Sequence, residues 1–289
     1  MSAHRSLVRL GLGLAILLGT IPAATRAQAG STLYIPSVAR TYRPGALPAL
    51  GVGDWSQEAH DAQRSGFVAV EPKTPWTLLW KFNAADAAGG SSCPGGDPTR
   101  GHCYNAPEGA HTVVGRDAVF VPAGASGLYG LNAATGAVLW RVTSATFNAT
   151  PAYADGFVYA GSADGRLFKI DAASGTATTY AAGSALNRGI LIAGASAFAL
   201  ADNGELHKVA LGSLARQWVY TAGSSATEGT GLAYSPSRDV IIFGTNDLYV
   251  HAVRNVDGVR KWRTKPSPNP AGFPNQFLHY WPVVAERNG

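Results

Sequence analysis

The chain has 289 residues, of which 46% are hydrophobic, 10% aromatic and 14% charged. That length is enough for one large domain or two small ones, and the low charge content excludes a charge-rich disordered chain and a coiled coil. Many turn-forming residues (35 glycines and 17 prolines) among many aromatics favour an all-β protein. The net charge of +5 comes partly from Arg5, Arg9 and Arg26, in a stretch without acids. No later basic run is interleaved with aromatics, which argues against nucleic acid as a partner.

Residues 1–29 have the pattern of a secretory signal peptide. Arg5 and Arg9 form a positive region, residues 10–21 are apolar, and residues 27–29 read Ala-Gln-Ala, a cleavage pattern that predicts a mature start at Gly30. The apolar stretch is about 12 residues long, whereas a helix that spans a bilayer needs roughly 20. We therefore expect export to the periplasm, the cell surface or the medium, without a transmembrane segment after cleavage.

Residues 30–53 are predicted to be a linker. Pro36, Pro44 and Pro48 argue against a regular element in this stretch. The remaining residues, 54–289, are predicted to form one domain.

That domain contains an internal repeat. Aromatic residues that close four similar segments, Trp140, Tyr180, Trp218 and Trp262, are roughly 40 residues apart. Each segment reads as short strands separated by turn pairs such as Asp-Gly and Ser-Gly. A four-stranded antiparallel unit of this period is typical of a β-propeller blade.

The repeat predicts about four blades. Their central and outer strands fall at residues 117–142, 157–181, 197–220 and 240–264. Their less regular first strands are expected at residues 149–153, 189–193 and 231–234. Residues 76–82 resemble an isolated outer strand, and residues 277–286 resemble the first strand of a fifth blade. The prediction is therefore an incomplete ring.

Residues 132–136, Asn-Ala-Ala-Thr-Gly, followed by Trp140, resemble the tryptophan-docking motif of pyrroloquinoline-quinone-like (PQQ-like) β-propeller repeats. Quinoprotein alcohol dehydrogenases and the BamB subunit of the outer-membrane β-barrel assembly machinery carry such repeats. The opening residues 54–66 are similar to the lead-in of these proteins. In the second unit, Tyr180 lies one place beyond the tryptophan position.

The resemblance implies that a hydroxyl and a glycine turn shape one blade edge while a tryptophan stacks on the neighbouring blade. The expected docking residues are Asn132, Thr135, Gly136, Trp140, Asp171, Ser174, Gly175, Trp218, Gly258 and Trp262.

The leading functional hypothesis is an exported, non-enzymatic propeller that serves as a binding or scaffold module for another protein or a surface polymer. One alternative is a fragment of a quinone-dependent dehydrogenase, which would need PQQ and Ca²⁺; another is a carbohydrate- or polymer-binding surface protein. No catalytic, cofactor-binding or metal-binding residue is predicted. Acids that fall at predicted turns are interpreted as turn formers: Asp155, Asp164, Asp171, Asp202 and Asp257.

Cys93 and Cys103 are the only cysteines and lie in a loop rich in glycine and proline. In an exported protein, this pattern predicts a disulfide. The alternative is a metal site that adds His102 and His111, but its spacing matches no established zinc pattern. The remaining histidines of interest are scattered over different units and are expected to be surface or strand residues: His60, His207, His251 and His279.

Overall fold

A computed structural model of the chain describes residues 54–67, 77–80, 82, 107, 109–227, 230–265 and 281–285. These residues belong to one compact unit, residues 31–289. They form sixteen β-strands and, within these ranges, no helix; nothing in the described part is a helix able to cross a membrane. The predicted signal peptide, the linker at residues 30–53, Cys93, Cys103 and His279 lie outside the described residues.

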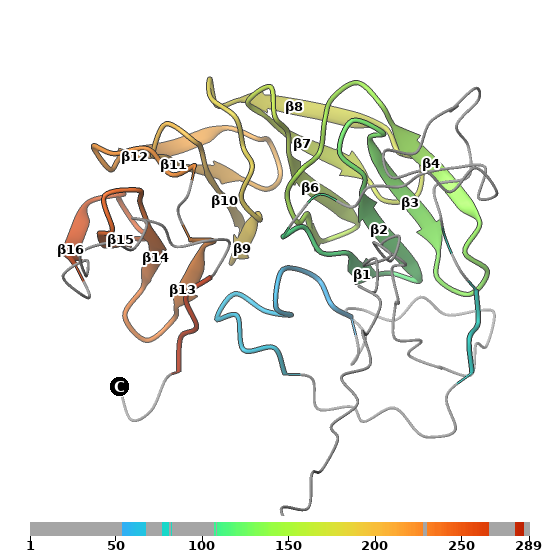
Figure 1. The fold of residues 1–289 in the computed structure, drawn as a ribbon, viewed down its shortest axis with the longest axis horizontal. Coiled ribbons are helices and arrows are strands. Elements are labelled where there is room, and N and C mark those ends of the chain that lie inside the picture. The colour runs from blue at the N-terminus through green and yellow to red at the C-terminus, as the bar shows by residue number, and fades with distance from the viewer. Residues whose placement is uncertain are drawn as a thin grey trace, which may run out of the picture. The chain divides into compact units, whose positions relative to one another are not determined.

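The strands are grouped into four blades in chain order (Figure 1). Blade 1 comprises β1 (Val113–Gly115), β2 (Ala118–Pro122), β3 (Leu128–Asn132) and β4 (Val138–Val142). Blade 2 comprises β5 (Ala152–Ala154), β6 (Phe157–Gly161), β7 (Arg166–Asp171) and β8 (Ala177–Ala181). Blade 3 comprises β9 (Leu191–Ala193), β10 (Ser196–Leu200), β11 (Glu205–Ala210) and β12 (Arg216–Thr221). Blade 4 comprises β13 (Ala233–Ser235), β14 (Val240–Gly244), β15 (Val250–Arg254) and β16 (Arg260–Thr264).

Each blade is a four-stranded antiparallel meander in which every strand pairs with its neighbours in sequence. This confirms the predicted four-blade, all-β architecture. The first strand of blades 2, 3 and 4 begins two or three residues later than predicted. In blades 2 and 3, a residue just before the strand pairs outside its own blade. Ile190, for example, donates its N–H to the carbonyl oxygen of Thr150 in the blade before (3.1 Å).

The four blades are arranged side by side as part of a propeller. The first strands are neighbours in the order β1, β5, β9 and β13, so they line the inner edge, while β4, β8, β12 and β16 lie on the outside (Figure 1). The described residues contain no further blade between blade 4 and blade 1. The structure is therefore an open ring of four blades, as the repeat predicts.

The core lies between neighbouring blades. At the first junction, Phe120 of β2 stacks on Tyr153 of β5, with ring centroids 5.6 Å apart, and on Trp140 of β4. Comparable clusters fill the junctions between blades 2 and 3 and between blades 3 and 4. Strands β2 and β10 are buried along their whole length. Blades 2 and 4 cover the two faces of β10, whereas blade 2 covers one face of β2 and a cluster with Trp80 and Phe82 covers the other. The outer strands are mostly exposed.

The predicted outer strand at residues 76–82 is wrong as secondary structure. Side chains from this stretch nevertheless pack where those of an outer strand would. Residues 77–80 form no strand. Trp80 and Phe82 nevertheless pack against a cluster of blade 1 that contains Tyr129 and Leu131. This stretch thus covers blade 1 on the side away from blade 2.

Candidate functional site

Tryptophan side chains join the blades through a repeated pair of contacts. The indole Nε1 of Trp140 donates a 2.8 Å hydrogen bond to the carbonyl oxygen of Ala172 in the next blade. The same indole covers Gly175, where an added Cβ would lie 2.8 Å from Trp140. Glycine is thus required both by this contact and by its positive φ of 76°. The equivalent contacts are made by Trp80 with Ala133 and Gly136, and by Trp218 with Asn255 and Gly258.

The turns that receive the indoles are shaped by a side chain at their first position. Asn132 Oδ1 accepts hydrogen bonds from the N–H of Ala134 and from the N–H and hydroxyl of Thr135, at 3.0 to 3.1 Å. Asp171 makes the same contacts with Ser174, and these bonds hold the pKa of its carboxyl below the usual value. Such turns place the following glycine where the indole can reach it.

The junction between blades 2 and 3 lacks a tryptophan and is built differently. Thr178 pairs with Lys169, the position that Trp140 occupies opposite Gly130 in blade 1. On the facing turn, Leu214 stands in place of the glycine, with a φ of 57°. The carbonyl that would accept from an indole belongs to Leu211, and Tyr159 donates its hydroxyl to it instead (2.9 Å).

A β-bulge accompanies the tryptophans. Blades 1, 3 and 4 have a register shift between their third and fourth strands, whereas the corresponding pairing in blade 2 is regular. Without the extra residue, Tyr180 pairs with Leu167, as Val142 pairs with Leu128 in blade 1. Tyr180 is therefore two pairing positions beyond the tryptophan site rather than one.

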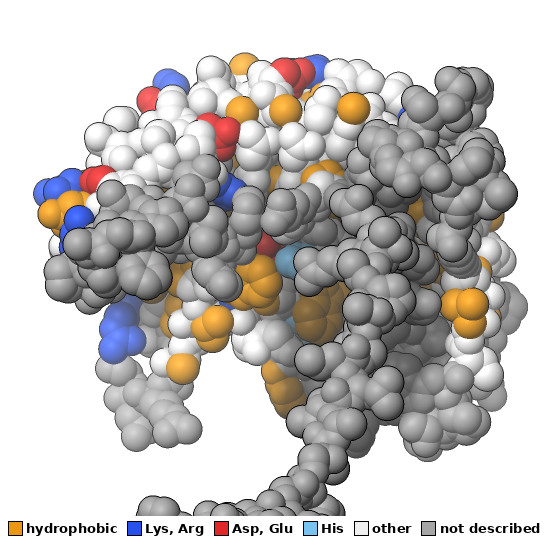
Figure 2. All heavy atoms as spheres, in the orientation of Figure 1, with side chains coloured by type: hydrophobic (Ala, Val, Ile, Leu, Met, Phe, Trp, Pro, Cys, Tyr) orange, Lys and Arg blue, Asp and Glu red, His pale blue; other side chains and the backbone are white. Residues whose placement is uncertain are grey.

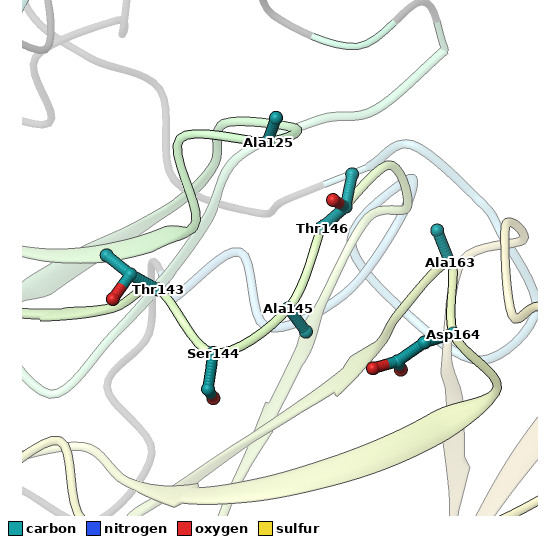
Figure 3. Close-up of a pocket in the computed structure, with 7 residues that line it drawn as sticks. All are labelled: Ala125, Thr143, Ser144, Ala145, Thr146, Ala163 and Asp164. Atoms are coloured by element: carbon teal, nitrogen blue, oxygen red, sulfur yellow. The ribbon is translucent and has the colours of Figure 1, made fainter.

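Two shallow pockets lie among the blades. One has a volume of about 520 Å³ at the junction without a tryptophan and is lined by Phe157, Lys169, Asp171, Ser174, Thr176, Thr178, Thr179, Gly212, Ser213 and Leu214. The other has a volume of about 400 Å³ between loops of blades 1 and 2 and is lined by Ala125, Thr143, Ser144, Ala145, Thr146, Ala163 and Asp164 (Figure 3). Their walls are mainly small side chains and hydroxyls, without a cluster of catalytic groups.

Residues 54–66, called here the axial segment, connect the inner strands of all four blades. In each blade, the middle residue of the first strand donates its N–H to this segment. The acceptors are Trp55 O for Val114 (2.8 Å), Ser56 O for Tyr153 (2.6 Å), Gln57 Oε1 for Ile192 (3.0 Å) and Ala62 O for Tyr234 (2.7 Å). The segment thereby accepts hydrogen bonds from backbone N–H groups on the inner strands that do not pair with another strand of their blade.

Arg64 anchors the axial segment through its buried guanidinium. It donates to the carbonyl oxygens of Leu232 (2.7 Å), Glu58 (2.6 Å) and Ile190 (3.5 Å). Its Nη2 also lies 3.7 Å from the Glu58 carboxylate. Burial lowers the pKa of Arg64 to about 10, against the opposing effect of Glu58 and Asp61, so Arg64 is charged at neutral pH.

The Glu58 carboxylate lies near the first residues of several blades. Its Oε1 is 3.9 Å from His111 Nδ1, and its Oε2 lies close to Gly189 and Gly231 without a hydrogen bond. Among the described residues, no three His, Cys, Asp or Glu side chains come together as metal ligands would.

Blade 4 presents its docking tryptophan to solvent. Trp262 on β16 is 38% exposed, compared with 8% for Trp140, and Val256 and Val259 in the preceding turn are more exposed still. All five residues of β16 are exposed, and they include Arg260, Lys261 and Arg263. Basic and hydrophobic side chains gather over β15 and β16 at the left of Figure 2.

Two of the histidines are strand residues, one of the two placements expected for them. His207 and His251 lie on β11 and β15, and both are buried, with exposed fractions of 3% and 0%. They occupy equivalent positions, each one residue before the residue that pairs with the tryptophan of its blade. His60 adopts a positive φ of 81° in the axial segment, and His111 precedes β1. Of the acids expected at turns, Asp171 ends β7 and the others lie in turns.

Residues 67–272 match the family described as outer membrane protein assembly factor BamB. The chain belongs to this family. No curated protein matches it. The BamB family assignment covers all four blades, in agreement with the resemblance seen in the docking motif.

Solved structures with a similar fold include BamB from Moraxella catarrhalis, with 18% identity, coverage of 55% of this chain and 49% of that one, and a TM-score of 0.48. Another is the quinohemoprotein alcohol dehydrogenase ADHIIG from Pseudomonas putida HK5, with 14% identity, coverage of 57% and 34%, and a TM-score of 0.49. The designed protein Ika8 has 16% identity, coverage of 53% and 48%, and a TM-score of 0.48. The chain thus spans about half the length of BamB and of Ika8.

Proposed function

We propose that this BamB-family chain is an exported, non-enzymatic scaffold that binds an acidic partner protein through the outer face of blade 4. The observation that carries the proposal is Trp262, a docking tryptophan that is exposed on β16 while its counterparts at the other junctions pack on a neighbouring blade. An exposed indole is costly in water and is a typical anchor of protein interfaces.

Charge specifies the kind of partner. Arg260, Lys261 and Arg263 flank Trp262 on the same strand, whereas the nearby Asp257 is paired with Arg254. Long-range attraction would therefore favour an acidic surface and would weaken with salt. The fourth strand also offers backbone groups for β-augmentation, in which a partner adds an extended segment to a sheet edge.

Site-specific photo-cross-linking in the native host tests the proposal. A photoreactive residue at Lys261 should give one discrete adduct that Trp262→Ala removes and that high salt reduces. The matched control places the same residue at Thr178, an exposed position on the outer strand of blade 2. Equal adducts at both positions, or none at Lys261, would contradict binding at blade 4.

Export and the absence of enzymatic activity are separate parts of the proposal. The signal-like residues 1–29 and the BamB family assignment support export. Cell fractionation should recover the protein outside the cytoplasm with Gly30 at its N-terminus. Incubation with PQQ, Ca²⁺, an alcohol and a redox dye should give no dye reduction; turnover would instead support the dehydrogenase alternative.

A further inference from the structure

Two tyrosine–histidine pairs cross consecutive blade junctions at equivalent positions. The hydroxyl of Tyr180 on β8 is 2.9 Å from Nδ1 of His207 on β11. The hydroxyl of Tyr220 on β12 is likewise 2.9 Å from Nδ1 of His251 on β15. The first pair joins blades 2 and 3, and the second joins blades 3 and 4.

The junction between blades 1 and 2 has an apolar pair in the same place. Val142 pairs with Leu128 as Tyr180 pairs with Leu167, and Phe168 follows Leu167. Val142 and Phe168 belong to one buried cluster. The molecule therefore contains two junctions with a titratable residue and one matched junction without it.

The hydrogen bonds around His251 define its tautomer. The Thr245 hydroxyl donates to Asp247 Oδ1 (2.6 Å), so its oxygen accepts from His251 Nε2 (3.1 Å). His251 therefore carries its proton on Nε2, and Nδ1 accepts from the hydroxyl of Tyr220. The single nitrogen left to take up a proton is Nδ1, which contacts Tyr220 of the preceding blade.

Protonation would reverse the interblade bond. Once Nδ1 carries a proton, it can only donate, and the hydroxyl of Tyr220 must turn its own hydrogen elsewhere. The new cation would also be buried, stacked on Phe243 at 5.1 Å between ring centroids. A buried charge without a direct carboxylate contact is strongly unfavourable, so opening the junction to water becomes the cheaper state.

We propose that the junctions on both sides of blade 3 open in acid, because protonation of His207 and His251 breaks their tyrosine contacts, while the junction between blades 1 and 2 stays closed. The inference is independent of what binds to blade 4. In this proposal, acid opens the two junctions that contain a tyrosine–histidine pair. The junction between blades 1 and 2, which has no such pair, does not respond.

The surroundings of His251, burial above all, make the junction between blades 3 and 4 the more sensitive of the two to acid. Asp247 favours protonated His251 through Thr245, but Arg260 and Arg263 on β16 oppose it. Burial is the largest effect and lowers the pKa of His251 to about 4.

His207 has a closer acid. Its Nε2 is 3.6 Å from Glu205 Oε2 on the same strand, while Arg216 on β12 opposes protonation. Burial still lowers the pKa of His207 below its usual value. Because an exposed histidine titrates near pH 6.5, the open state of either junction binds protons first as the pH falls. At the junction between blades 3 and 4, closure is thus fully present above about pH 6.5 and is lost as the pH falls toward the His251 pKa of about 4.

Hydrogen exchange of the full chain at about pH 7 and about pH 4.5, corrected for intrinsic exchange rates, tests the proposal. Peptides from β13 to β16 should lose protection on the order of 50-fold relative to β1 to β4, since the open-state and closed-state histidines titrate near 6.5 and 4. Uniform loss in all four blades, or unchanged protection of blade 4, would overturn the proposal.

The double variant Tyr220→Val with His251→Phe copies the apolar pair of the first junction. It should abolish the acid loss in blade 4 while leaving the response of the junction between blades 2 and 3. If that variant fails to fold, His251→Gln provides the same test with a neutral acceptor. NMR of the wild type should show the Nε2–H tautomer of His251 near pH 7. Acid-induced loss that persists in these variants, or the Nδ1–H tautomer, would count against the proposal.

Discussion

The Tyr159 hydroxyl donates a 2.9 Å hydrogen bond to the carbonyl oxygen of Leu211, and so takes the place of the indole N–H used at the other junctions. Tyr159→Phe would leave that carbonyl without its donor. We expect a loss of unfolding free energy of about 1–3 kcal/mol, the usual cost of an unpaired buried acceptor. Urea denaturation measures it, and an unchanged midpoint would show that the tyrosine does not replace the indole in energetic terms.

The docking tryptophans should differ in energy according to whether a blade covers them. Trp140→Ala removes a buried indole and its bond to Ala172, and is expected to cost about 3–5 kcal/mol. Trp262→Ala, at an exposed indole, should cost less than about 1 kcal/mol. Thermal and chemical denaturation compare the two. Equal losses would mean that blade 4 is covered in solution.

Gly175 and Gly183 form a matched pair for testing the docking contact. Both have a positive φ, of 76° and 84°, but a Cβ at Gly175 would lie 2.8 Å from Trp140, whereas nothing lies within 4 Å of one at Gly183. Each change to alanine should cost roughly 1–2 kcal/mol through the left-handed backbone. Gly175→Ala should lose a further 1–3 kcal/mol or so by displacing the indole. The difference in denaturation midpoints isolates the contribution of the contact between Trp140 and Gly175. Equal midpoints would show that this contact does not add to stability.

Arg64 should be the residue on which the axial segment depends most. Arg64→Met leaves the carbonyl oxygens of Leu232 and Ile190 without their donor and the buried Glu58 carboxylate without its nearby positive charge, at an expected cost of about 3–5 kcal/mol. Glu58→Gln is the control, because Arg64 keeps its carbonyl partners; its effect should be clearly smaller. Increased proteolysis near residues 54–66 in the Arg64 variant alone would locate the damage. A larger loss of unfolding free energy in the Glu58 variant would mean that the segment depends more on Glu58 than on Arg64.

Cys93 and Cys103 should be linked in exported protein. Closing a loop of this size is worth roughly 3 kcal/mol in the chain-entropy model. Mass spectrometry of a non-reduced digest should show the two peptides joined, and Cys93→Ser should leave the blades folded because the clusters between the blades are built from residues 113–253. Two free thiols, or stoichiometric zinc, would contradict the prediction.

The sequence repeat alone specifies much of this structure. Blade number, strand order and the turn at residues 132–136 are local properties, since a four-stranded meander pairs only residues close in sequence. The spacing of glycine and hydroxyl-bearing residues along the chain therefore predicts the blades and their turns directly. The exposed position of Trp262 could not be read in this way, because Trp140, Trp218 and Trp262 share one motif and differ only in whether a neighbouring blade covers them.

Tertiary structure decided the contacts between distant residues. Nothing in the sequence indicates that residues 55, 56, 57 and 62 each meet a different blade. Trp55, Ser56 and Ala62 do so through backbone carbonyls, which leave no trace in residue type. Gln57 uses its side chain, but its partner Ile192 is 135 residues away. Tyr159 at a junction without tryptophan, and the burial of His207 and His251, likewise depend on packing between sheets rather than on local spacing. Periodicity thus specified each blade, whereas the burial and hydrogen bonding between blades, which set the energies and the pKa of His251, arise only when the blades are packed together.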